Sequence, residues 1–125
     1  MLFDTDVLIW VFRGNAKAAK AVDDSPERVV SVVTYMELLQ GARDKRELKA
    51  IKSFLTDLHF GMLPLTENIG HRASIYMEEY ALGASLTMAD ALLAATAAEH
   101  DQTLLTGNDR HFRVIKDLEF KAFRP

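Results

Sequence analysis

Residues 29–33 read VVSVV, a short run that is rich in β-branched residues and apolar at almost every position. Such a run predicts a strand that is buried on both faces, as in a parallel sheet. Other short apolar stretches also predict strands: MLFD (1–4), GMLPL (61–65), TLLT (103–106) and an edge-like EFKAF (119–123). Because helical patterns separate these strands, the sequence predicts an α/β fold with helices on both faces of a parallel sheet.

Helix patterns fill the segments between the expected strands. The chain is expected to turn at DTD (4–6) into a helix that runs to about Val11. The other expected helices are AKAAKAVDD (16–24), one opened by Thr34, one continuing after Gly41 through KRELKAIKSFLTDL (45–58), one from about Glu67 to Leu82 and one from Thr87. No repeat, low-complexity run or linker interrupts them, so residues 1–125 are expected to form one domain.

The composition narrows the class of protein. Of the 125 residues, 49% are hydrophobic and 26% are charged, which is ordinary for a globular domain. A formal net charge of −3 argues against nonspecific coating of nucleic acid but permits a local basic patch. The absence of cysteine excludes disulfides, thiol catalysis and Cys-type zinc sites. The opening MLFDTDVLIW has acids where a secretory signal carries Lys or Arg and is too short to cross a membrane, so a soluble, cytoplasmic protein is expected.

Carboxylates follow several of the predicted strands. Asp4 and Asp6 come after the first strand, Glu37 after VVSVV and Asp109 after TLLT. The carboxyl ends of parallel strands meet at one edge of a sheet, so these side chains are expected to share a rim. Asp90 joins them if the helix that Thr87 opens begins at the same rim.

The spacing of these acids has two explanations. TYME (34–37), TMAD (87–90) and TGND (106–109) each place an acid three residues after a threonine, as in a helix capping box. If the acids converge instead, each close pair repels by about 4 kcal/mol at ~4 Å and an effective dielectric near 20, so a cation is needed. Oxygen ligands with open positions suit Mg²⁺ or Mn²⁺, which activate water at phosphodiester bonds. On that explanation the protein is a metal-dependent phosphodiester hydrolase.

Four stretches taken together resemble a known family. In order, LFDTDVLIW, SVVTYMELLQGA, TMADALLAATAAEH and LLTGNDRHF are similar to the motifs of the PIN-domain ribonucleases, and within them to the VapC toxins. The resemblance implies a three-layer α/β/α sandwich with a mainly parallel sheet of four or five strands. It also implies an RNA substrate, a homodimer, a small VapB-like antitoxin and a Mg²⁺ or Mn²⁺ site. By motif, the catalytic and metal-binding residues are Asp4, Glu37, Asp90 and Asp109.

Position 6 departs from the family pattern, because it is Asp where the family commonly has Asn or Ser. We expect Asp6 to cap the following helix rather than to join the site. In the fourth motif the sequence leaves open whether Asn108 or Asp109 faces the metal, and Thr106 is a candidate to orient its neighbour. The basic residues that follow are candidates for RNA contact, with a plain surface loop as the alternative; they are Arg110, His111, Arg113 and Lys116.

Two other functions fit parts of the sequence. DTDV (4–7) matches the motif of haloacid-dehalogenase-like phosphatases, with Asp4 as nucleophile and Asp6 as acid/base. The paired acids that such enzymes use later in a longer chain have no counterpart here beyond Asp23 and Asp24, which come too early. The second alternative is a non-catalytic PIN-like binding domain, against which the presence of all four acids argues.

Overall fold

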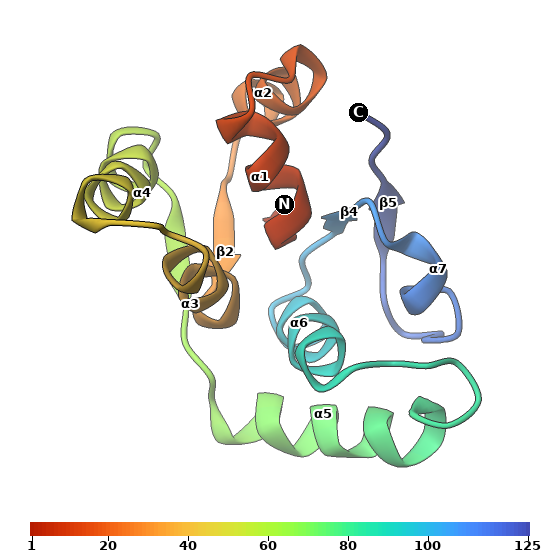
Figure 1. Ribbon diagram of the computed structural model, residues 1–125. Coiled ribbons are helices and arrows are strands. Elements are labelled where there is room, and N and C mark those ends of the chain that lie inside the picture. Colours follow the sequence, from red (N-terminus) through yellow and green to blue (C-terminus); the bar gives the residue numbers. More distant parts are fainter.

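A computed structural model of residues 1–125 contains a five-stranded sheet in which every strand is parallel to its neighbours (Figure 1). The strands are β1 (Leu2–Phe3), β2 (Val29–Ser31), β3 (Gly61–Leu63), β4 (Leu104–Thr106) and β5 (Phe120–Ala122). Their order across the sheet is β3-β2-β1-β4-β5, so β1 is central and β5 is an edge. The predicted parallel α/β sheet and its edge-like last strand are confirmed.

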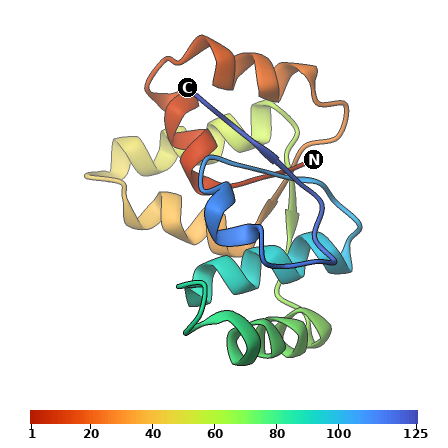
Figure 2. The ribbon, with the colours of Figure 1, turned by 90° about the vertical axis from the view of Figure 1, so that its right-hand side faces the viewer.

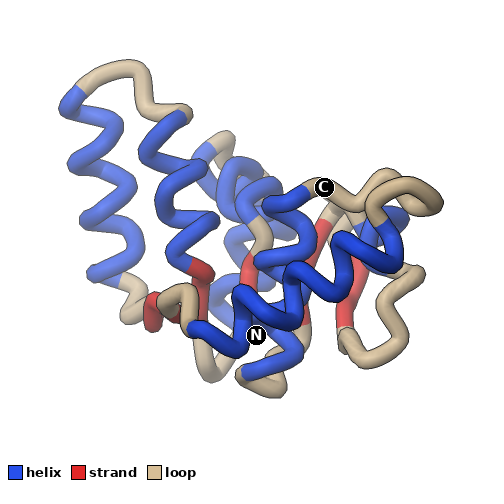
Figure 3. The backbone as a smooth tube through the Cα atoms, turned by 90° about the horizontal axis from the view of Figure 1, so that it is seen from below, coloured by secondary structure: helices blue, strands red, loops and turns tan.

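Seven helices connect and cover the strands. They are α1 (Thr5–Phe12), α2 (Ala16–Asp24), α3 (Val32–Gln40), α4 (Lys45–Asp57), α5 (Glu67–Tyr80), α6 (Met88–Glu99) and α7 (Asp109–Phe112). Helices α5 and α6 pack closely against each other at one end of the view in Figure 2, and Figure 3 shows the strands between the helices. None of these helices combines the length and apolarity that a membrane crossing needs.

Two hydrophobic cores lie on opposite faces of the sheet. Leu2 packs in a core with residues of α5, α6 and α7, whereas its neighbour Phe3 packs in a core with residues of α1 to α4. Val29 and Val30 divide between the two cores in the same way. Because successive strand side chains point to opposite faces, a strand in the middle layer is buried on both sides and is apolar at most positions. This burial explains the largely apolar runs in the sequence.

The VVSVV stretch ends as a strand earlier than expected. Strand β2 stops at Ser31, whose hydroxyl accepts a hydrogen bond from the Val33 backbone N–H at 3.1 Å and so caps α3. Val32 and Val33 are therefore helical, and Thr34 does not open the helix. The expectation of a capping box between Thr34 and Glu37 is wrong, because both residues lie inside α3.

Two other boundaries differ from expectation. Helix α5 ends at Tyr80 rather than at Leu82, and the short helix α7 has no counterpart among the predicted elements.

The position of β1 in the sheet matters more for function. Its two neighbours in the sheet are β2 and β4, so the chain crosses to opposite sides from this strand. In parallel sheets, such a switch point leaves a crevice beyond the carboxyl ends of the strands, where ligands bind.

Candidate functional site

A pocket of about 240 Å³ lies beyond the carboxyl end of β1. We call it the acidic pocket, because four carboxylates and one amide from separate parts of the chain line it: Asp4, Asp6, Glu37, Asp90 and Asn108. Asp90 reaches it because α6 begins at this rim. Four of the five acids that the sequence predicts on one rim therefore share one pocket, and Asp109 does not.

Asp4 is the most buried acid of the pocket, with 9% of its surface exposed. It is the residue before α1, and its Oδ1 accepts the Thr5 backbone N–H at 2.7 Å. Its Oδ2 accepts the Thr106 hydroxyl at 2.7 Å. Burial, and then the nearby Asp6 charge, raise the pKa of Asp4 to about 7. Two hydrogen bonds to the carboxylate do not offset its burial among other acids.

Glu37 lies on the second turn of α3, the helix that directly follows β2. Its Oε1 accepts a hydrogen bond from the Thr5 hydroxyl at 2.7 Å. Thr5 is the first residue of α1, so this contact ties the start of α1 to α3. No sequence signal singles out Thr5, because a threonine at the start of a helix is ordinary.

Asp90 caps the start of α6 and also lines the acidic pocket. Thr87 and Asp90 form a reciprocal capping box at the start of α6, with the Thr87 N–H donating to Asp90 Oδ2 at 3.2 Å and the Asp90 N–H donating to Thr87 Oγ1 at 3.1 Å. Nδ1 of His111 also lies 3.1 Å from Asp90 Oδ2. The capping explanation is correct for this stretch, and the same carboxylate still lines the acidic pocket.

Asp6 does not cap α1, and the expectation that it would is wrong. Asp4 occupies the capping position, and Asp6 Oδ2 instead accepts the Gly107 backbone N–H at 2.9 Å. A Cβ at position 107 would lie 2.5 Å from that oxygen, so only glycine permits this close approach. Asp6 thus links α1 to the loop after β4 and adds a carboxylate to the acidic pocket.

Asp109 lies outside the acidic pocket and is only 3% exposed. Its Oδ2 accepts a hydrogen bond from Arg113 Nη2 at 2.6 Å, and its Oδ1 accepts one from Arg124 Nη2 at 2.9 Å. These guanidinium groups, that of Arg124 foremost, lower the pKa of Asp109. The TGND stretch is not a capping box either, because Thr106 Oγ1 donates to Asp4 and accepts the Asn108 N–H at 3.0 Å. Asn108, not Asp109, is the fourth-motif residue that lines the acidic pocket.

In their type, though not in their spacing, the donor atoms of the acidic pocket suit a hard divalent cation. They are all oxygens, the type that Mg²⁺ and Mn²⁺ prefer. Two buried side-chain oxygens have no hydrogen-bond partner, Asp6 Oδ1 and Thr34 Oγ1, and both residues line this pocket. Glu37 and Asp90 are each hydrogen-bonded to other side chains, and no three acidic or histidine side chains converge closely enough to enclose an ion.

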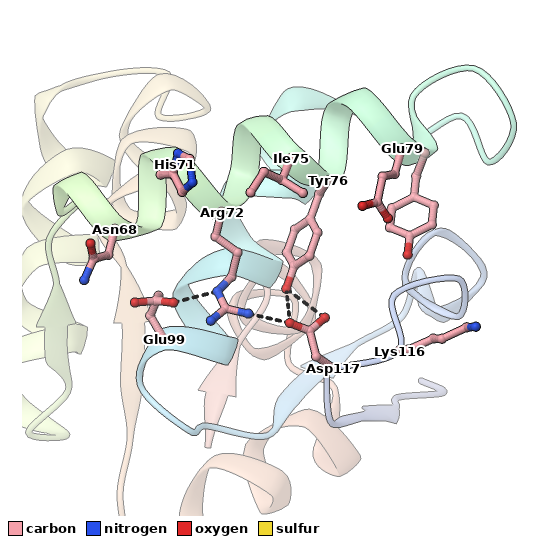
Figure 4. Close-up of a pocket in the computed structure, with 10 residues that line it drawn as sticks. Asn68, His71, Arg72, Ile75, Tyr76, Glu79, Glu99, Lys116 and Asp117 are labelled. Carbon is pink, nitrogen blue, oxygen red and sulfur yellow. Dashed lines mark hydrogen bonds and ion pairs between the residues drawn. The ribbon is translucent and has the colours of Figure 1, made fainter.

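The four basic candidates for RNA contact separate in space. Arg110 and Arg113 line a hollow beside the acidic pocket, together with Arg124, which the sequence patterns did not indicate. His111 contacts Asp90. Lys116 lies instead at a different hollow, of about 490 Å³, over α5 and α6 (Figure 4).

Several of the polar residues that line the hollow in Figure 4 hold parts of the fold together. Arg72 of α5 pairs with Glu99 of α6 at 2.6 Å and with Asp117 before β5, and the Tyr76 hydroxyl donates to Asp117 at 2.9 Å. These contacts hold α5 against α6 and the chain that leads to β5. None of the acids of the acidic pocket is among its lining residues.

An acidic, oxygen-lined pocket at the switch point of a small parallel α/β sheet defines a class of candidate metal-binding enzymes. Comparison with known proteins identifies the family. A model of the PIN domain matches residues 1–118, and the chain belongs to the PIN-domain family.

Similar proteins include two ribonucleases of Mycobacterium tuberculosis. The chain is 34% identical to ribonuclease VapC10 in an alignment of 126 positions that covers 95% of this chain and 90% of the relative. It is 32% identical to ribonuclease VapC19, covering 94% of this chain and 96% of the relative. The family match leaves no support for the phosphatase interpretation of DTDV, and Asp23 and Asp24 are exposed at the end of α2.

Solved structures agree with this assignment. A chain of a toxin–antitoxin complex from Klebsiella pneumoniae is 30% identical, with a TM-score of 0.80 over 94% of this chain and 93% of that chain. A chain of a DNA-bound VapBC structure from Salmonella typhimurium has a TM-score of 0.83, covering 97% of this chain and 96% of that one. At 18% identity, this second match supports the fold alone.

Proposed function

We propose that this protein is a divalent-metal-dependent endoribonuclease and the toxin of a toxin–antitoxin pair. One observation carries the proposal: carboxylates from α1, α3 and α6 and the amide of Asn108 line one pocket at the switch point of a PIN-domain sheet. Relatives that are 32% and 34% identical over nearly the full chain are named as ribonucleases. We place its activity in the cytoplasm, where a toxin meets cellular RNA.

Asp4 and Asp90 are the residues that we assign to direct metal contact, with Mg²⁺ or Mn²⁺ as the ion. Such an ion, when bound, orients and activates water and neutralises charge on a phosphoryl group. The chain prepares the Asp4 carboxylate for this role, because the Thr106 hydroxyl and the Thr5 N–H fix both of its oxygens. Burial first, and then the charge of Asp6, raise the pKa of Asp4, and a bound cation would stabilise its charged form.

Glu37, Asp6 and Asn108 complete the proposed site. Glu37 is exposed and held by the Thr5 hydroxyl, so it is suited to accept a proton from an incoming water. Asp6 has one buried oxygen without a partner, which fits a further contact to the ion or its water. Asn108 takes the place in the site that the sequence motif assigns to Asp109.

The test compares Asp90→Asn with the wild-type protein in cleavage of single-stranded RNA. We expect cleavage to fall by at least 100-fold in Asp90→Asn while the circular dichroism spectrum is unchanged, and EDTA to stop wild-type cleavage until Mg²⁺ or Mn²⁺ is added. The control is Asp57→Asn, which removes an exposed carboxylate at the end of α4 and should cleave normally. Full activity of Asp90→Asn would refute the assignment, and metal binding without cleavage of any RNA would indicate a binding domain.

The proposed antitoxin has a suitable docking surface. An apolar groove of about 540 Å³ runs between α1, α3 and α4, and its lining includes Ile9, Phe12, Leu38, Ile51 and Phe54. Glu37 lines both this groove and the acidic pocket. A partner segment with an apolar face in the groove would therefore reach the acids with a basic side chain. The 30% identical chain of a structure named as a toxin–antitoxin complex supports a partner of this kind. The homodimer that the family resemblance implies belongs to the same proposal, and sedimentation of the purified protein tests it.

A further inference from the structure

A second hollow, of about 460 Å³, lies directly beside the acidic pocket. We call it the arginine hollow, because three of its lining residues are arginines: Arg110, Arg113 and Arg124. Asp6 and Asn108 line both the arginine hollow and the acidic pocket, so the two share a wall. One extended polymer strand can therefore contact both hollows at once.

Two of the three arginines in this hollow are held in place by the buried Asp109 carboxylate. Asp109 is nearly inaccessible and bonds one Nη atom of Arg113 and one of Arg124, at 2.6 and 2.9 Å. Arg124 also donates from Nη1 to the Phe123 carbonyl at 3.0 Å. These contacts connect α7 to the C-terminal residues that follow β5. One buried carboxylate thus orients two arginines from different parts of the chain.

The outward side of the arginine hollow is cationic. The side chains of Arg113 and Arg124 are 61% and 62% exposed, whereas the Asp109 side chain between them is 4% exposed. A guanidinium has five N–H donors, so both arginines keep donors that face solvent after bonding Asp109. Arg110 is exposed and makes no ion pair. The other acidic side chain in the lining, that of Asp6, accepts the Gly107 N–H.

We propose that the arginine hollow binds a backbone phosphate of the RNA strand next to the one held at the acidic pocket, and that Asp109 is a positioning residue for its arginines rather than a metal ligand. This inference rests on the proposed nuclease function. Guanidinium groups bind phosphate through paired, charge-assisted hydrogen bonds, and pre-orientation reduces the entropy lost on binding. The arginine hollow and the acidic pocket share a wall, so one RNA strand could place a phosphate at the proposed metal and the next phosphate against the arginines.

The arginines are tested singly, because each is exposed and its replacement leaves Asp109 paired with the other arginine. For Arg113→Gln and Arg124→Gln we expect the KM for single-stranded RNA to rise roughly tenfold with little change in kcat, as when one charge-assisted hydrogen bond to the substrate is removed. The slope of log(kcat/KM) against log[salt] should also become shallower by about 0.7 for each phosphate that the protein no longer neutralises. The matched control is Arg46→Gln, an exposed arginine on α4 that lines neither pocket and should leave KM and slope unchanged. Wild-type KM and slope in both variants would overturn the proposal.

Asp109→Asn separates positioning from metal binding. We expect it to raise KM as the arginine variants do, while its affinity for Mn²⁺, measured by calorimetry in the absence of RNA, stays at the wild-type value. Asp4→Asn should weaken Mn²⁺ binding. If Asp109→Asn weakens Mn²⁺ binding as strongly as Asp4→Asn, Asp109 is a metal ligand and the positioning role is wrong. A failure of the proposed nuclease function would give a different result. In that case the folded, Mn²⁺-bound wild-type protein would cleave no RNA, and the proposed phosphate site would be refuted as well.

Discussion

The substitution Asp4→Asn should stabilise the metal-free protein at alkaline pH even as it removes activity. Asp4 is 9% exposed, and burial followed by the charge of Asp6 raises its pKa from 3.8 to about 7. Asparagine keeps an acceptor for the Thr5 N–H. The Thr106 hydroxyl, which now donates to Asp4, is able to rotate and accept from the new amide. The substitution therefore removes a buried charge and keeps the shape of the site.

The magnitude follows from the difference between the folded and unfolded pKa of Asp4. The native state holds this proton more tightly than the unfolded state, so the free energy of unfolding falls as pH rises from about 4 to about 7. Each pKa unit corresponds to about 1.36 kcal/mol, which makes the whole loss about 4 kcal/mol at most. Between pH 5 and pH 8, the wild-type protein should lose roughly 3 kcal/mol through Asp4, and Asp4→Asn should lose none of it.

Urea unfolding in EDTA at pH 5 and pH 8, followed by the fluorescence of the single tryptophan, Trp10, measures this difference. Titrating groups far from Asp4 change both proteins alike, so the difference between the two pH differences reports Asp4 together with its coupling to Asp6. Asp57→Asn, at an exposed position, should behave as the wild type does. Mg²⁺ at 100 times its Kd should return about 2.7 kcal/mol to the wild type but much less to Asp4→Asn. Stability curves that stay parallel from pH 5 to pH 8 for wild type and Asp4→Asn would refute the reasoning.

Two further predictions concern the loop after β4 and the far hollow. Gly107→Ala places a Cβ 2.5 Å from Asp6 Oδ2, so thermal unfolding should show a loss of stability of about 1–3 kcal/mol, and RNA cleavage should fall. The control Gly70→Ala, in an open helical position, should be neutral or stabilising. Equal behaviour of the two variants would contradict the steric argument. Tyr76→Phe removes the hydroxyl that donates to Asp117, so it should cost about 0.5–1.5 kcal/mol of stability with unchanged cleavage, and a loss of cleavage would mean that the hollow over α5 takes part in function.

Much of the fold could be predicted from local patterns. The largely apolar runs at 29–33 and 103–106 predicted strands in the middle layer, and the structure confirms strands at 29–31 and 104–106, each of which contributes to both cores. The order of strands and acids also predicted that carboxylates would gather at one rim. That prediction needs only the parallel direction of the strands, which the alternation with helices implies.

The sequence could not locate the boundary inside VVSVV. Valine at positions 32 and 33 favours a strand by local preference, but the Ser31 hydroxyl caps α3 and starts the helix two residues early. A serine inside a β-branched run was the available signal. Its effect depends on whether the neighbouring backbone N–H groups have partners in the sheet, which is a tertiary property.

The partners of Asp6 and Asp109 were also beyond local pattern. Asp6 binds a backbone N–H about a hundred positions away, and Asp109 binds Arg124 across the last strand. Spacing in sequence shows that an acid lies near a strand end but not which way its carboxylate turns. The presence of Arg113 four residues after Asp109 was a usable signal, because that spacing favours an ion pair on a helix.

Helix capping and a role in the site are compatible explanations for Asp90. The capping box at Thr87 fixes the first turn of α6, and it holds the carboxylate by the same oxygen that lies near His111. The start of a helix also favours negative charge, so this position lowers the cost of keeping one more carboxylate beside Asp4. A threonine–acid spacing is therefore weak evidence for or against a site by itself. The distinguishing observation is what surrounds each carboxylate: Asp90 faces a pocket lined by other acids, and Asp109 faces two arginines.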